Sequence, residues 1–163
     1  MNKSKVTVLA LYPNRYGVGY ALFDAPDHLI EYGIGYVQPV NNKKTIKKVR
    51  DYIEYYKPDI IITRDVNDIA KKTSKRIETL IDCICNEAKL QNLEIHSFTR
   101  TQIKEVFSAF KAHSKYQIAL KLIEWFGELK KYQFPIRKRW MRENHNTGIF
   151  DATSLAMTYY YLK

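Results

Sequence analysis

The stretch of sequence best equipped for chemistry is a basic and aromatic segment, residues 130–142. Cationic side chains in it alternate with Tyr132, Phe134 and Trp140. Its cations are Lys130, Lys131, Arg137, Lys138, Arg139 and Arg142. Cations bind backbone phosphates, and aromatic rings stack on unpaired bases. The segment therefore predicts a surface for single-stranded or branched nucleic acid, contacted by these cations and by Trp140. The alternative is a solvated loop whose aromatic side chains anchor it to the core.

The overall charge favours the same class of partner. The 163 residues include 27 Lys and Arg against 17 Asp and Glu, a formal net charge of +10. A strongly positive chain attracts polyanions, and nucleic acid is the first to consider. A second basic cluster follows a predicted strand and consists of Lys71, Lys72, Lys75 and Arg76. The lysines of residues 43–50 fall on the polar side of a predicted helix, where we expect them to be solvated.

Other chemistries lack the residues they need. The sequence contains no glycine-rich phosphate loop, no serine triad and no Cys/His cluster. Cys83 and Cys85 are two residues apart in a predicted helix, so they point to different faces and cannot grip one metal ion. Two such cysteines indicate a reducing compartment. No apolar run approaches the ~20 residues of a membrane-spanning helix. We therefore expect a cytoplasmic protein with no membrane partner.

The hydrophobic pattern predicts one α/β domain over residues 1–163. Three strands, at residues 5–11, 15–24 and 29–38, are separated by short turns and predict an antiparallel meander. Helices and strands then alternate. The predicted helices are 45–56, 74–89, 101–107, 114–126 and 151–162, and the remaining strands are 60–63 and 93–98. Residues 130–145 are predicted to be a loop. This order predicts a five-stranded mixed sheet flanked by helices.

Several short motifs mark the junctions of these elements. The first strand leads into Tyr12-Pro13-Asn14, and residues 18–23 read Val-Gly-Tyr-Ala-Leu-Phe. Residues 58–65 read Pro-Asp-Ile-Ile-Ile-Thr-Arg-Asp, residues 114–117 read Ser-Lys-Tyr-Gln, and residues 148–151 read Gly-Ile-Phe-Asp. In this order and spacing, over nearly the whole chain, the motifs resemble the ribonuclease H-like superfamily, most closely the RuvC-type Holliday-junction resolvases.

The resemblance implies a nuclease site in which carboxylates hold two divalent cations. One of the four family positions clearly retains its acid here. Tyr12 replaces the acid of the first strand, Arg64 replaces that of the fourth, and Gly148 replaces the first acid of the last helix. Asp151 retains the second acid of that helix. Asp65 follows Arg64 by one residue, so it needs a strand bulge to face the site.

Both acids also have ordinary structural alternatives. Asp65 is equally suited to a loop or a helix cap, and Asp151 to the N-cap of the last helix. Arg64 is informative because a guanidinium can occupy the volume of a cation and still bind phosphate.

These residues leave the enzymatic status open and define three hypotheses. The leading one is a RuvC-like nucleic-acid-binding protein, a degenerate nuclease (pseudonuclease) acting on branched or single-stranded DNA rather than RNA, with no cofactor. The first alternative is an active Holliday-junction endonuclease with Mg²⁺ or Mn²⁺ held by the catalytic residues Asp65 and Asp151. The second is a structural or dimerisation module of the same fold. The resemblance also implies a homodimer.

Overall fold

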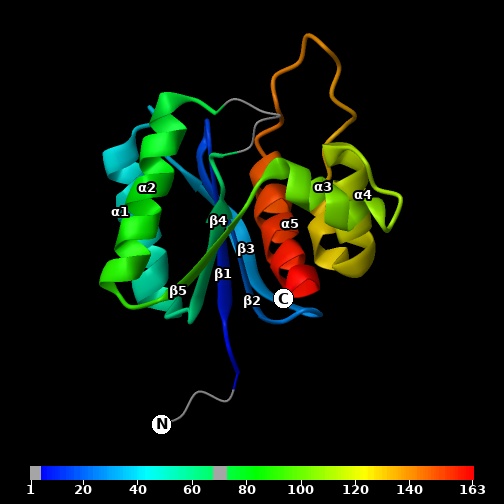
Figure 1. Ribbon diagram of the computed structural model, residues 1–163. Helices are drawn as coiled ribbons and strands as arrows, with labels where there is room; N and C mark the ends of the chain where they lie inside the picture. Colours follow the sequence, from blue (N-terminus) through cyan, green and yellow to red (C-terminus); the bar gives the residue numbers. More distant parts are fainter. Residues whose placement is uncertain (1–4, 68–72) are drawn as a thin grey trace.

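A five-stranded mixed sheet lies at the centre of the structure (Figure 1). The computed structural model describes residues 5–67 and 73–163. Its strands are β1 (Val8–Asn14), β2 (Gly17–Ala25), β3 (His28–Tyr36), β4 (Ile60–Arg64) and β5 (Glu94–Phe98). They lie in the order β3-β2-β1-β4-β5, with β1, β2 and β3 antiparallel and with β4 and β5 parallel to β1. The predicted mixed sheet, with its antiparallel first three strands, is confirmed.

Helices cover both faces of this sheet. On one face lie α1 (Asn42–Tyr56) and α2 (Lys75–Leu90). On the other face α5 (Thr147–Leu162) packs directly on β1 and β2, and α3 (Arg100–Ser108) and α4 (Lys115–Trp125) pack against α5. A short 3₁₀ helix, η1 (Gly127–Tyr132), follows α4. None of the helices within the two described ranges is both long and apolar enough to cross a membrane.

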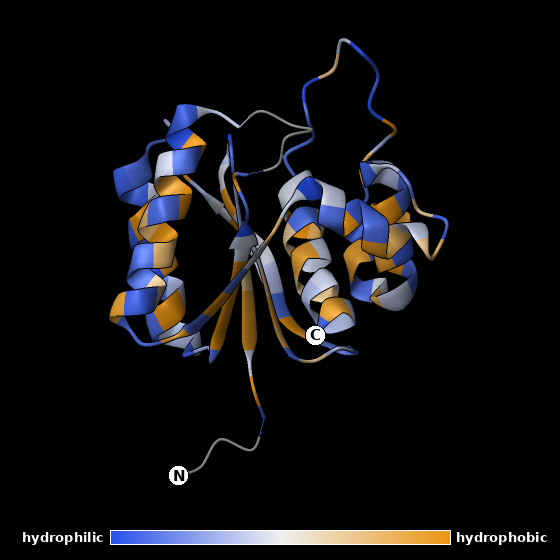
Figure 2. Cartoon of the chain, in the orientation of Figure 1, coloured by the Kyte–Doolittle hydropathy of each residue, from blue (hydrophilic) through white to orange (hydrophobic). Residues whose placement is uncertain are grey.

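The alternation of side chains along β1 divides the core into two layers. Leu9 and Leu11 face α1 and α2, whereas Ala10 and Tyr12 face α5, because successive side chains of a strand point to opposite faces. Helix α5 is buried around its whole circumference for most of its length, which is why its sequence is apolar or small on every side. Helices α1 and α2 differ from α5 in this respect, because they carry hydrophilic residues on their outer faces (Figure 2). Tyr12 therefore lies in the same layer as α5.

Three predicted boundaries were wrong at positions that affect the site. Tyr12-Pro13-Asn14 does not form a turn but continues β1, pairing with residues 17–19 of β2. Proline has no backbone N–H to donate to a neighbouring strand. This lack is tolerated at Pro13 because the pairing of β1 with β4 already ends at Ala10. Helix α5 begins at Thr147, four residues before the predicted start, and the first residues of the predicted loop belong to η1.

The start of α5 approaches β2 so closely that only glycine fits between them. A Cβ on Gly19 would lie 2.2 Å from the carbonyl oxygen of Gly148. A Cβ on Gly148 would lie 2.7 Å from Nδ2 of Asn14. This backbone contact sets the depth at which α5 sits against the sheet.

Replacing Gly19 by alanine is expected to destabilise the protein. The added methyl group meets backbone rather than a flexible side chain, so the cost is about 1–3 kcal/mol or more, as for other overpacked cores. Urea unfolding followed by circular dichroism measures it. The matched control is Gly127→Ala, because nothing lies within 4 Å of a Cβ there. Equal stability of the two variants would contradict the close contact.

Candidate functional site

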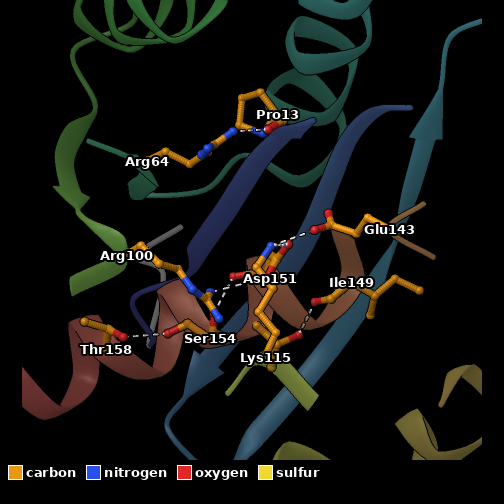
Figure 3. Close-up of polar contacts among 10 residues, drawn as sticks. Pro13, Arg64, Arg100, Lys115, Glu143, Ile149, Asp151, Ser154 and Thr158 are labelled. Carbon is orange, nitrogen blue, oxygen red and sulfur yellow. Dashed lines mark hydrogen bonds and ion pairs between the residues drawn. The ribbon is translucent and has the colours of Figure 1, made fainter. Parts of the chain in front are cut away.

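Five polar side chains from five different elements meet beside the end of β1. Tyr12 comes from β1, Arg64 from the end of β4, Arg100 from the first residue of α3, Lys115 from the first residue of α4 and Asp151 from α5. Figure 3 labels the last four of these residues. Parallel strands β1 and β4 end at the same edge of the sheet, and α5 begins there. We call these five residues the buried cluster.

Both carboxylate oxygens of Asp151 are engaged by cations. Its Oδ1 lies 3.5 Å from a terminal nitrogen of Arg100, and its Oδ2 lies 3.3 Å from Nζ of Lys115. The exposed fractions of the Asp151 and Arg100 side chains are 4 % and 9 %. Asp151 is the fifth residue of α5, and the N-cap residue is Asn146, so the N-cap interpretation of Asp151 was wrong. Its carboxylate instead lies between the largely buried Arg100 and the half-buried Lys115.

Arg64 packs on the aromatic ring of Tyr12. Its guanidinium carbon lies 4.5 Å from the ring centroid, within range of a cation–π interaction, and its NH1 group donates to the carbonyl of Pro13 at 2.8 Å. Burial raises the pKa of the Tyr12 hydroxyl, and the nearby Asp151 carboxylate raises it further. The hydroxyl is therefore neutral at pH 7 and does not replace the negative charge of the acid expected at this position.

Lys115 links the buried cluster to the segment before α5. Besides Asp151, its ammonium group contacts Oε2 of Glu143 at 3.0 Å. Burial by itself lowers the pKa of Lys115, but Asp151, Tyr12 and Glu143 outweigh burial, so the net shift is upward and the side chain stays charged. Arg100 thus contacts Asp151, Lys115 contacts both Asp151 and Glu143, and Arg64 contributes a third cation on the ring of Tyr12.

Asp65 lines the same small pocket as Tyr12, Arg64 and Arg100. Its carboxylate accepts a hydrogen bond from the Asn67 backbone N–H at 2.9 Å, which closes a local turn. The paired residues of β4, Ile60–Arg64, show no register shift against β5, and Asp65 follows the last of them. Asp65 therefore closes a turn beside the pocket, and its role as a metal ligand stays a prediction.

The residues at this position do not fit a pair of divalent cations. Within the described part of the chain, no group of three or more His, Cys, Asp and Glu side chains is arranged to hold a metal ion. Asp151 is neutralised by Arg100 and Lys115, and Gly148 lies where the helix backbone packs against Gly19. Magnesium prefers several oxygen ligands in octahedral geometry, and the cationic side chains present here offer none.

The predicted nucleic-acid contacts are all exposed. Lys130 and Lys131 lie on η1, and the others lie on the segment that rises beyond the end of the sheet before α5 (Figure 1). The others are Arg137, Lys138, Arg139, Trp140 and Arg142. Phe134 is instead buried against Phe150, as the anchored-loop alternative predicted for the aromatic residues. The segment thus combines one anchored ring with exposed cations and an exposed Trp140.

The described residues of the second basic cluster, Lys75 and Arg76, do not share one kind of environment. Lys71 and Lys72 lie outside the described residues. Arg76 is directed inward, where it donates to the carbonyl of Asn14 at 3.0 Å and to Oδ1 of Asn42 at 3.2 Å. Lys75 is exposed on α2. The described part of this cluster therefore offers one free surface cation and one structural arginine.

Comparisons with known proteins identify the fold. No family model matches the chain, and no curated protein is significantly similar to it in sequence. Among solved structures, the chain matches two structures of Thermus thermophilus RuvC, one of them in complex with a Holliday-junction substrate. The TM-scores are 0.67 and 0.65, the identity is 13 %, and the matches cover 96 % of this chain and 94 % and 93 % of the RuvC chains. It also matches the Fowlpox virus resolvase in complex with Holliday-junction DNA, with a TM-score of 0.52, 14 % identity, and coverage of 92 % of this chain and 97 % of that one.

The protein has the RuvC-type, ribonuclease H-like fold. In this RuvC-like fold, the four positions that the sequence resemblance assigns to acids all lie at the same end of the sheet. They are Tyr12, Arg64, Gly148 and Asp151. Arg100 and Glu143 were missed by the sequence interpretation, and Lys115 was noticed within a motif but given no role. No local pattern indicates that these three charges meet.

Removing the charge of Asp151 is expected to destabilise the fold strongly. Asp151→Asn leaves Arg100 and Lys115 without their buried counter-ion, a change that costs about 3–5 kcal/mol in other buried pairs. Asp51→Asn is the matched control, because Asp51 also lies 3.3 Å from a lysine, Lys47, but its side chain is 58 % exposed. An exposed pair contributes about 0–1 kcal/mol. Chemical unfolding of both variants measures the difference, and similar losses would contradict the structural role of Asp151.

Proposed function

We propose that this chain is a RuvC-like DNA-binding protein in which side-chain cations have replaced the metal ions of a nuclease site. The observation that carries the proposal is that Arg100 and Lys115 engage both carboxylate oxygens of Asp151. A divalent cation would have to displace two charged groups that are part of the chain.

The electrostatics of the buried cluster oppose metal binding further. Arg64 adds a third positive charge against the ring of Tyr12. Coulomb repulsion between like charges is stronger in a partly desolvated site than in water, so these cations disfavour an incoming metal ion. A guanidinium can also bind a phosphate of a DNA backbone. The proposed protein therefore binds DNA without cutting it.

The surface and the fold support DNA as the ligand. Exposed cations lie on the segment before α5, which rises beyond the end of the sheet that holds the buried cluster (Figure 1). Lys130 and Lys131 are exposed on η1. Two of the solved structures with this fold contain Holliday-junction DNA. We propose branched DNA as the substrate class on these grounds, with DNA favoured over RNA. The homodimer implied by the resemblance stays a prediction, which light scattering of the purified chain would test.

A four-way DNA junction distinguishes this proposal from an active nuclease. We expect the affinity for the junction to be the same in EDTA as in millimolar Mg²⁺ or Mn²⁺, when NaCl keeps the ionic strength constant. We also expect no cleavage above background with either metal. Fluorescence anisotropy and denaturing gels measure the two quantities. Cleavage by the natural sequence would instead support the metal-dependent endonuclease if Asp65→Asn abolishes it, or if Asp151→Asn abolishes it while circular dichroism shows that this variant is still folded.

Salt dependence tests whether the exposed cations contact phosphates. Replacing Arg137, Lys138 and Arg139 together by alanine should weaken binding to all DNA sequences. Each lost phosphate contact should also reduce the slope of log K against log salt by about 0.9 on duplex DNA. The matched control replaces Lys43, Lys44 and Lys47 together by alanine. This triple variant loses the same number of positive charges, but from the exposed side of α1. Equal slopes for the two triple variants would show that the segment before α5 makes no specific phosphate contacts.

A further inference from the structure

The segment that rises beyond the sheet is held firmly at both ends. We call residues 135–142 the Trp140 finger. Before it, Phe134 is buried, with its ring 5.5 Å from that of Phe150. After it, the backbone carbonyl of Glu143 accepts a hydrogen bond from the Tyr16 hydroxyl at 2.6 Å, and its carboxylate contacts Lys115. The finger is therefore a loop with two fixed roots.

The tip of the finger is a hydrogen-bonded turn. The N–H of Met141 donates to the carbonyl of Lys138 at 2.9 Å, which places Arg139 and Trp140 at the two central positions of the turn. The side chain of Arg137 closes the turn from outside, because its Nε donates to the carbonyl of Met141 at 2.9 Å. Trp140 is thus presented by a defined backbone.

Trp140 combines high exposure with cationic surroundings. Its exposed fraction is 79 %, and the ammonium group of Lys138 lies 5.5 Å from its ring. The finger contains four cations and no acidic residue. An aromatic ring surrounded by cations is the combination that binds single-stranded nucleic acid, because the ring stacks on a base while the cations neutralise the neighbouring phosphates.

We propose that the Trp140 finger is a base-stacking site that recognises an unpaired base in branched DNA. Every base inside a continuous duplex is covered on both faces by its neighbours, so the ring of Trp140 finds a free face at a branch point, in a single strand or at a duplex end, but not along the duplex. The finger therefore distinguishes interrupted DNA from continuous duplex, whereas its cations bind both. This inference rests on the proposed DNA-binding function.

Binding to two DNAs of equal charge tests the inference. One is a four-way junction with unpaired thymines at its centre, and the other is a continuous duplex with the same number of phosphates. Trp140→Ala should weaken binding to the junction on the order of 5- to 100-fold, the range that corresponds to losing one stacked base, and leave duplex binding within about two-fold. Trp140→Phe should retain most of the affinity for the junction.

The matched control is Tyr55→Ala, which removes another exposed aromatic ring, 80 % exposed on α1, and should change neither affinity. A second readout uses fluorescence. The chain has two tryptophans, and Trp125→Phe leaves Trp140 as the only one. Its emission should be quenched by oligothymidine and by the junction, and not by the duplex.

The outcomes separate the two proposals. If the natural sequence binds neither DNA, the proposed function is wrong and the finger assignment fails with it. If it binds both DNAs but Trp140→Ala has no effect, or weakens both equally, the stacking site is wrong and the DNA-binding function stands. Unchanged Trp140 fluorescence on binding the junction would likewise overturn the stacking site.

Discussion

The structure depends on one buried carboxylate that must be neutralised. Asp151 lies inside α5, the helix that packs directly on β1 and β2, and an isolated charge in such a place costs several kcal/mol. Arg100 and Lys115 supply the compensation, and each is the first residue of its own helix, α3 or α4. The ion pairs therefore hold the starts of both outer helices against α5, in addition to the apolar contacts below them.

Metal ions and side-chain cations can both neutralise carboxylates that lie close together in a protein. Four carboxylates with two divalent cations sum to zero charge, and such a site needs all its acids to hold the metals. Here the carboxylates of Asp65, Asp151 and Glu143 lie near the cations of Arg64, Arg100 and Lys115. Because these cations are covalently part of the chain, the site keeps its charge balance in the absence of metal.

The sheet and the order of helices were predictable because they follow from local periodicity. The four family positions could also be located, because each belongs to a short motif attached to a predicted strand or helix. The continuation of β1 through Pro13 was missed, since a proline after an apolar run indicates a turn unless the neighbouring strand has already ended. Arg100 and Glu143 were missed for a different reason. They are 43 residues apart in sequence, and only the packing of α3 and the finger root against α5 brings both near Asp151.

The buried cluster and the root of the Trp140 finger are joined by the ion pairs of Lys115. Lys115 contacts Asp151 and Glu143 at once, so the carboxylate that the resemblance assigns to catalysis also helps to fix the root of the finger. If Lys115 moved with a shifting Glu143, it would leave Asp151 with less compensation in a buried site, and this cost opposes the movement. The finger root therefore has one preferred position before any ligand arrives. A binding loop that is already ordered loses less conformational entropy on association, so more of the stacking and phosphate contacts contributes to affinity.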